Sequence, residues 1–284
     1  MEFKEYVKAA SLEEAWELNQ KKPNRVAGGM LWLRLGKGSI GTVIGLEELG
    51  LGGIEETEEA FRIGAMTTLR ELELNGAFNA YSQGAAADAV HHIIGTQFRN
   101  MATVGGSIAG RFGFSDVLTL FLAMDTEVEL YRGGGKTALL SLEEYAAEGS
   151  GRDILTALIV KKTQADYSYQ SVRISESDFP VLTMAACRLT DPGKTGPLWR
   201  FACGARPHRA KAAELPEGML DRMTSGDASS AESEKEIAKA AAWLKDRFPT
   251  GSNMRGSADY RTHLVGVLAE RAVRRLTGEE GRSC

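Results

Sequence analysis

Short apolar runs separated by charged or glycine-rich stretches recur along the whole chain. Runs of about four to eight apolar residues bounded by turn residues predict buried strands. Turn residues at 132–136 and 191–194 indicate that the strands on either side of each are joined directly. We expect strands at residues 2–7, 25–27, 42–44, 60–65, 127–131, 137–140, 154–160, 181–189 and 198–203.

Helices are expected where a capping residue precedes a helix-forming run. The capping-box pattern, Ser followed three residues later by Glu, begins at Ser11 and again at Ser141. Ser115-Asp116 precedes the almost wholly apolar segment 117–124, which should be buried on most sides. Further helices are expected at 12–20, 67–74, 80–94 and in most of the chain after 203, interrupted by an exposed loop at 225–233 and a glycine- and serine-rich break at 251–256.

The order of these elements predicts an α+β fold. Strands followed by a helical carboxyl-terminal part lack the regular alternation of a doubly wound parallel sheet. The glycine- and glutamate-rich stretch 50–59 marks a subdomain boundary. In the first part, Leu31, Leu33 and Leu35 alternate with other side chains, which favours an extended segment.

Composition narrows the function. Hydrophobic residues make up 43% of the 284 residues and charged residues 25%, as in a soluble globular protein. The net charge of −4 argues against a nucleic-acid surface, but backbone N–H groups can still bind a small anionic ligand. We see no signal peptide and no apolar stretch of about 20 residues, so we expect a cytoplasmic protein without a membrane span.

Cysteine and histidine usage gives no sign of a metal site. Cys187, Cys203 and Cys284 are odd in number and widely spaced, which predicts reduced thiols. Three cysteines cannot hold an iron–sulfur cluster alone, because such clusters usually take four thiolates. His91-His92 are expected to serve helix-end or packing roles.

Two glycine pairs, Gly28-Gly29 and Gly105-Gly106, are the main candidates for ligand binding. Glycine lacks Cβ and adopts positive φ, so its backbone can approach a phosphate closely. Thr103 and Ser107 add hydroxyl groups beside the second pair. Each pair alone is typical of an ordinary turn. The Rossmann fingerprint and the P-loop are both absent, so a dinucleotide would bind in another arrangement.

Several segments together resemble the FAD-binding subunit of molybdenum hydroxylases, the xanthine dehydrogenase and carbon monoxide dehydrogenase family. The resemblance covers essentially the whole chain, and the Arg-Asn-x-x-Thr-x-Gly-Gly segment from Arg99 is its most specific part. The matching segments, in the family's order, are 26–29, 61–68, 95–109, 115–125 and 254–261.

The resemblance implies a non-Rossmann fold in which FAD lies extended between two subdomains, about 1–52 and 53–165, of an FAD-binding domain. A second α+β domain with a small antiparallel sheet and helices would occupy residues 166–284. By resemblance, Ala27–Leu31 covers the pyrophosphate, 103–107 contacts it from the other side, Asp116 holds ribityl hydroxyls and Leu158 packs beside the flavin ring. The implied FAD site is Val26, Ala27, Gly28, Gly29, Met30, Leu31, Thr103, Gly105, Gly106, Ser107, Asp116 and Leu158.

The resemblance also implies a role in electron transfer. An iron–sulfur subunit would pass electrons to FAD, and a molybdopterin subunit would hydroxylate a purine, aldehyde or aromatic heterocycle. NAD or another acceptor would take the electrons, and no catalytic acid or base is expected in this chain.

The sequence departs from the family at two places and leaves rival functions open. Met30-Leu31 replace polar residues after the first glycine pair, and no lysine stands at Gln170 or Ser171. A stand-alone flavin reductase of similar fold and a scaffold subunit that has lost FAD are the rivals. Arg99-Asn100 either order the second glycine loop or touch FAD, and Asp116 either holds the ligand or only begins a helix.

Overall fold

The computed structural model describes residues 2–149, 151–190, 196–221 and 230–278. The chain divides into two compact units, each made of segments that are not contiguous in sequence. These units cut across the expected boundary near residue 165, which stays a prediction. The first unit comprises Met1–Ala77, Ile93–Arg111 and Asp125–Lys162, and the second comprises Phe78–His92, Phe112–Met124 and Thr163–Cys284.

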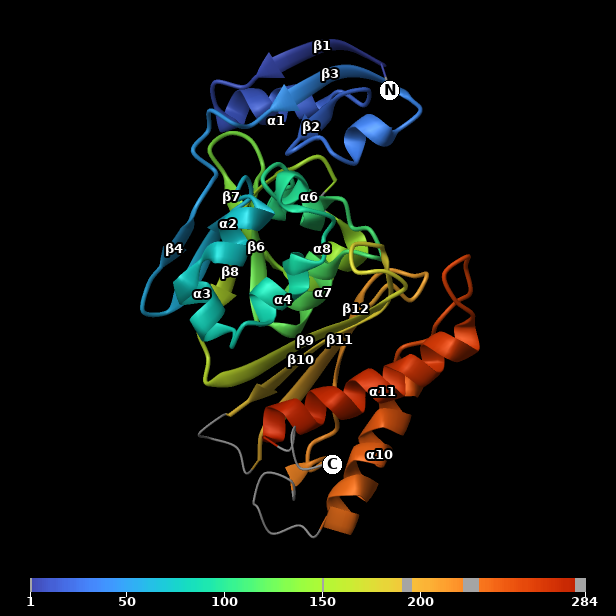
Figure 1. The fold of residues 1–284 in the computed structure, drawn as a ribbon. Coiled ribbons are helices and arrows are strands. Elements are labelled where there is room, and N and C mark those ends of the chain that lie inside the picture. The colour runs from blue at the N-terminus through green and yellow to red at the C-terminus, as the bar shows by residue number, and fades with distance from the viewer. Residues whose placement is uncertain (1, 150, 191–195, 222–229, 279–284) are drawn as a thin grey trace. The chain divides into compact units, whose positions relative to one another are not determined.

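The first unit begins with a small parallel sheet in the order β1-β3-β2 (Figure 1). These strands are β1 (Glu2–Lys8), β3 (Ser39–Gly45) and β2 (Arg25–Ala27). Helix α1 (Leu12–Gln20) packs against β3 and β2, and the Ser11 side chain caps it by accepting a hydrogen bond from the Glu14 N–H. This opening matches the expected strands and single helix.

A five-stranded antiparallel sheet in the order β4-β5-β8-β6-β7 forms the rest of the first unit. Short helices connect its strands, and α6 packs against β8 and β5. Its strands are β4 (Ile54–Glu56), β5 (Ala60–Gly64), β8 (Ile154–Lys161), β6 (Thr126–Tyr131) and β7 (Thr137–Ser141), and its helices α2 (Leu69–Leu74), α5 (Thr96–Arg99), α6 (Val104–Ala109) and α8 (Leu142–Glu148).

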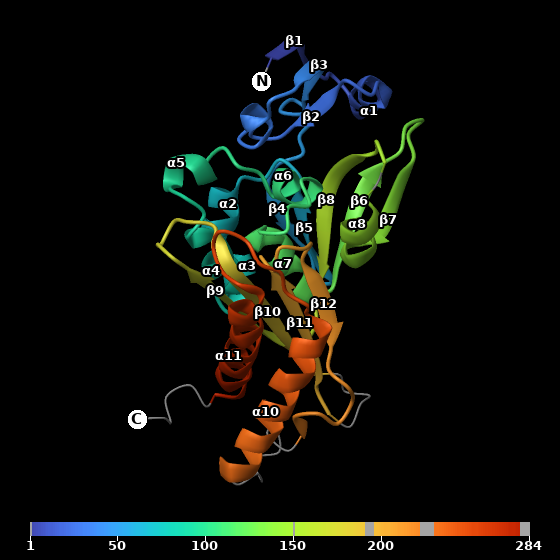
Figure 2. The ribbon, with the colours of Figure 1, turned by 90° about the vertical axis from the view of Figure 1, so that its right-hand side faces the viewer.

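The second unit is built on a four-stranded antiparallel sheet in the order β12-β11-β10-β9. Helix α7 packs against β10 and β11, while α11 packs against β10 and β9 and beside α10 (Figure 2). The elements are β9 (Ala165–Arg173), β10 (Pro180–Leu189), β11 (Leu198–Gly204), β12 (Lys211–Glu214), α4 (Ala85–His91), α7 (Asp116–Ala123), α10 (Ser230–Arg247) and α11 (Ala258–Thr277).

Strand β10 is buried on both faces. Successive side chains of a strand point to opposite sides. Leu182 and Met184 accordingly join the apolar core formed with α10 and α11, while the Thr183 hydroxyl donates to Thr119 of α7 at 3.2 Å. Helices on both faces of this sheet explain why the first eight residues of β10, 180–187, are all buried.

The structure differs from the expected elements at several places. Leu33–Leu35 form a 3₁₀ turn instead of an extended segment. The expected helix 80–94 is two helices, α3 (Gly76–Tyr81) and α4, because Gln83 and Gly84 have φ of 47° and 84°. Strands β9 and β12 were not expected. The turn 191–194 and most of the loop 225–233 lie outside the described residues, and α10 begins at Ser230.

Candidate functional site

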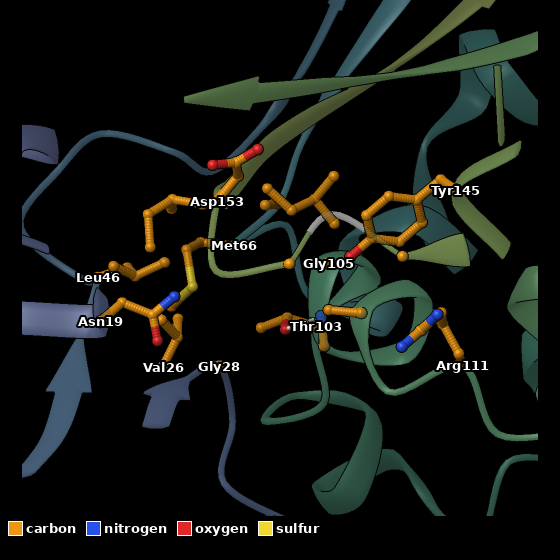
Figure 3. Close-up of a pocket in the computed structure, with 17 residues that line it drawn as sticks. Asn19, Val26, Gly28, Leu46, Met66, Thr103, Gly105, Arg111, Tyr145 and Asp153 are labelled. Atoms are coloured by element: carbon orange, nitrogen blue, oxygen red, sulfur yellow. Dashed lines mark hydrogen bonds between the residues drawn. The ribbon is translucent and has the colours of Figure 1, made fainter. Parts of the chain in front are cut away.

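A cavity of about 210 Å³ lies in the first unit (Figure 3). Asn19, Leu46 and Asp153 lie toward one end, and Arg111 and Tyr145 lie at the other. The two glycine segments lie between these ends. The lining consists of Asn19, Val26, Gly28, Leu46, Ala65, Met66, Thr103, Gly105, Gly106, Ala109, Arg111, Tyr145, Gly149, Gly151, Asp153, Ile154 and Leu155.

The first glycine pair packs directly against the segment that leads to the second. A Cβ added to Gly28 would lie 2.4 Å from the Thr103 hydroxyl oxygen, and one added to Gly29 would lie 1.7 Å from the Met101 carbonyl oxygen. Both distances are far below van der Waals contact. The absence of side chains at this pair is therefore required by the packing of the protein itself, whatever else binds there.

The second pair lies in the first turn of α6, not in an open turn. Thr103 caps this helix, and its hydroxyl accepts a hydrogen bond from the Gly106 N–H at 3.1 Å. The Gly105 N–H donates to the Ala65 carbonyl at 2.8 Å. A Cβ on Gly105 would lie 2.6 Å from Ala65. The N–H groups of this pair are thus already bonded within the protein.

The N–H groups of the first pair are in a different situation. Among the described residues, no protein acceptor receives a hydrogen bond from the N–H of Gly28 or Gly29. Met30, the next residue, has φ of 60°, a left-handed conformation that is uncommon for a side chain of its size. This loop therefore offers unbonded backbone donors beside the cavity, as a small anion requires.

Met30 serves packing. Its side chain packs against a small cluster made by Ala27, Ile40 and Val43. An apolar residue after the glycine pair, which the sequence marked as a departure from the family, is thus explained by this cluster.

The expected site residues fall into two groups, those that line the cavity and those that do not. Val26, Gly28, Thr103, Gly105 and Gly106 line the cavity. Leu158 is fully buried in β8 and Asp116 lies in the second unit. The residues outside the lining are Ala27, Gly29, Met30, Leu31, Ser107, Asp116 and Leu158.

The Asp116 carboxylate is enclosed by its own unit. The Tyr169 hydroxyl and the Arg173 guanidinium each donate to its Oδ1 at 2.5 Å. Burial raises the pKa of Asp116, and Arg173 and Tyr169 oppose that rise. The close guanidinium makes this a buried ion pair that holds β9 to the start of α7.

Arg99 orders the region of the second glycine segment. It is buried, and its Nε donates to the Glu73 carboxylate at 2.8 Å while Nη1 donates to the Ile93 carbonyl at 3.3 Å. These bonds hold α5 against α2, immediately before Met101 and Thr103. The contacts favour the ordering role for Arg99 over direct contact with a ligand.

The sequence did not single out Arg111, Tyr145, Asn19 or Asp153 as lining residues. Asp153 is engaged by Arg132 at 3.3 Å and by the Trp16 indole at 3.5 Å. Arg111 is the single lysine or arginine among the lining residues. The sequence shows that Arg111 stands two residues after α6. It does not show that Arg111 lines a cavity, because that depends on residues 145–149, which are distant along the chain.

Other chemistry has little support in the described part of the chain. Cys187 and Cys203 are buried free thiols, and burial raises the pKa of Cys203 to about 12. No group of three or more potential metal ligands occurs among the described residues. None of the described helices combines the length and apolar character needed to cross a bilayer.

Comparison with known proteins agrees with this geometry. Residues 1–162 match the FAD-binding domain of molybdopterin dehydrogenases, and residues 167–276 match the carboxyl-terminal domain of the CO dehydrogenase flavoprotein. The carbon monoxide dehydrogenase medium chain of Afipia carboxidovorans is 27% identical over 88% of this chain and 87% of its own. The nicotine 6-hydroxylase medium subunit of Paenarthrobacter nicotinovorans is 24% identical over 94% and 95%.

A solved structure shows the same fold. The chain in the carbon monoxide dehydrogenase of Hydrogenophaga pseudoflava that lacks the Mo-pyranopterin moiety is 21% identical, with a TM-score of 0.84 over 97% of both chains. The α+β class, the two-domain FAD-binding fold and the resemblance noted in the sequence are confirmed. The chain belongs to the FAD-binding flavoprotein subunits of the molybdopterin dehydrogenase family.

Proposed function

We propose that this chain is the electron-transfer subunit of a multi-subunit molybdenum hydroxylase and that its FAD lies in the cavity between the two glycine segments. The observation that carries the proposal is the backbone surface that the two glycine segments present to this cavity. Gly28 lines this cavity with a backbone N–H that binds no protein acceptor among the described residues, and Gly105 and Gly106 line it from the second glycine segment. Such a backbone surface suits a diphosphate.

The size of the cavity fits part of an extended ligand. At about 210 Å³ it is smaller than the roughly 300–1,000 Å³ of pockets that enclose a whole small molecule. It therefore encloses the centre of a dinucleotide, while the two ends extend beyond it. In this proposal Val26, Gly28, Thr103, Gly105 and Gly106 contact the ligand, and Ala27, Gly29, Met30, Leu31 and Ser107 shape the loops that hold it.

We propose that Asp116 and Leu158 act at the flavin end of the ligand, in the ways that their present contacts allow. Asp116 already accepts bonds from Tyr169 and Arg173, so it would bind a ribityl hydroxyl through its remaining lone pairs. Leu158 is fully buried, so it would act as support under the residues that touch the ring.

The bound FAD would supply the redox chemistry, taking single electrons from iron–sulfur clusters and passing a pair to NAD or another acceptor. The protein chain binds and orients it. Among relatives, the carbon monoxide dehydrogenase medium chain and the nicotine 6-hydroxylase medium subunit are subunits of larger enzymes by name. We propose the same arrangement here, with an iron–sulfur subunit and a molybdenum-cofactor subunit as partners.

The test is flavin uptake by the purified full chain, followed by affinity capture of partners from its native host. We expect FAD absorbance at a ratio near one per chain and co-purification of an iron–sulfur and a molybdopterin polypeptide. Partners without flavin would instead identify a scaffold subunit. Flavin with NADPH-dependent reductase activity and no partners would identify a stand-alone reductase, and neither result is compatible with the proposal.

A further inference from the structure

Arg111 places an unpaired cation in the cavity. Its Nη1 atom is buried, yet it has no hydrogen-bond partner among the described residues. No described carboxylate lies within ion-pair distance of this side chain either, although Asp153 lines the same cavity. A buried donor nitrogen without a partner is costly, and proteins normally satisfy it.

The backbone conformation at Arg111 also indicates a ligand site. Arg111 has φ of 46°, a left-handed conformation in which glycine is favoured. The residue before it, Gly110, has φ of −63°, which any residue adopts. The φ angle thus does not call for glycine at position 110, whereas at position 111 the chain has arginine in a conformation where glycine would relieve strain. Strain of this kind is found preferentially at ligand sites, where the side chain is needed.

Neighbouring residues leave room for the guanidinium. Gly149 has φ of 79°, and a Cβ there would lie 2.6 Å from Arg111 Nη1. Tyr145 lies beside Arg111 at the same end of the cavity, and its hydroxyl points toward Gly105 (Figure 3). The guanidinium therefore occupies a defined position beside the glycine segments.

We infer that Arg111 binds a phosphate oxygen of the dinucleotide, as a specific residue of the FAD site. The inference rests on the proposed function. The diphosphate carries the formal negative charges of FAD, and a guanidinium matches phosphate geometry through paired N–H donors. Gly28 contributes a backbone N–H group, and Arg111 contributes the charge that backbone groups lack.

The experiment measures ligand affinity of the full chain by fluorescence or calorimetry, using FAD, ADP, riboflavin and adenosine. Arg111→Gln should weaken FAD and ADP binding by about 10- to 100-fold, the range expected for a charge-assisted hydrogen bond. Riboflavin and adenosine binding should not change. Arg111→Lys should retain part of the affinity, and Lys136→Gln, which removes an exposed cation outside the cavity, should bind as the wild type does.

A second variant separates binding from folding. Arg111→Gly relieves the left-handed strain, so its thermal unfolding without ligand should be unchanged or higher than wild type while FAD affinity falls. Equal FAD affinity in wild type and Arg111→Gln would overturn the inference, as would an equal loss for riboflavin or a shifted flavin midpoint potential. If the wild type binds no FAD, the proposed function fails instead.

Discussion

At the scale of single residues, the glycine pairs show how one sequence signal can have two physical causes. The pairs were singled out because glycine lets a backbone approach phosphate. In the structure, Gly29 is needed first because Met101 leaves no space for a side chain. The packing of the protein itself fixes the shape of this loop, and we propose that the ligand binds to the loop in that shape.

Gly29→Ala should therefore destabilise the protein even without ligand. Its Cβ would lie 1.7 Å from a backbone carbonyl, which cannot rotate away, so we expect a loss of about 1–3 kcal/mol or more in the free energy of unfolding. Denaturant titration measures it. Gly38→Ala, whose Cβ would meet nothing within 4 Å, is the matched control and should change stability by less than about 0.5 kcal/mol. Equal stabilities of the two variants would show that the loop at Gly29 can shift to admit a side chain at little cost in free energy.

Glu13 gives the first unit a pH dependence. Its carboxylate accepts bonds from the Tyr131 hydroxyl at 2.5 Å and the Gly134 N–H at 2.7 Å, and the bond from Tyr131 is the main cause of a lowered pKa. Because the folded-state pKa lies below the ordinary value of 4.5, this stabilisation is present above that pH and is lost as the pH falls through the folded-state value.

The expected result is a smaller loss of stability on acidification in Glu13→Gln than in wild type, measured as urea midpoints between pH 7 and pH 3. Glu58→Gln, an exposed carboxylate of the same unit, should retain the wild-type acid dependence. Parallel curves for wild type and Glu13→Gln would mean that these hydrogen bonds do not favour the ionised carboxylate.

At the scale of elements, one arginine joins a helix, a strand and a loop. Arg261 of α11 is fully buried and donates to the carbonyls of Val181, Gly251 and Gly256 and to the Asn253 side chain. The glycine- and serine-rich break expected at 251–256 is thus an ordered loop that wraps this guanidinium. Its irregular sequence reflects the need to turn several carbonyl groups toward one side chain.

Arg261→Ala should leave these acceptors unsatisfied and cost about 3 kcal/mol or more of unfolding free energy. Arg261→Lys should recover only part of that loss, because an ammonium cannot reach four acceptors in the planar geometry of a guanidinium. Thermal denaturation compares the variants. A lysine variant as stable as wild type would show that charge alone is required.

Elements with strong local signals were predictable from sequence, and elements defined by distant partners were not. The capping box at Ser141 and the apolar helix α7 both appear where expected. Strand β9 was missed because its buried residues, Tyr167, Ser168 and Tyr169, are consecutive and carry polar groups, so they give no apolar period of two. Arg111 was missed for a similar reason. Its place in the cavity depends on Gly149, which is distant in sequence and close only in the folded chain.

At the scale of the whole molecule, the compact units do not follow the order of the chain. Helix α7 lies between the sequence segments of the first unit, yet all eight of its residues are buried and it packs on β10 and β11 of the second. The sequence comparison divides the chain after residue 162. The domain boundaries inferred from motif order therefore stay a prediction.

A fragment of residues 1–165 tests that prediction. It retains α7 but lacks β10 and β11, so we expect it to expose the apolar helix, bind a hydrophobic dye and aggregate, while the full chain remains monodisperse. Light scattering and dye fluorescence provide the measurement. A well-folded monomeric fragment would show that residues 1–165 form an autonomous domain.

The collision at Gly29 has a consequence for the history of this family. A lineage that abandoned its flavin would still be selected to keep glycine opposite Met101, because a side chain there would destabilise its fold. The double-glycine signature therefore reflects the packing of the fold and would persist after the redox role was lost. Genome surveys that count flavoproteins by this signature would include such descendants. A residue held under backbone strain only for the ligand, as we infer for Arg111, should be free to change to glycine once the cofactor is gone.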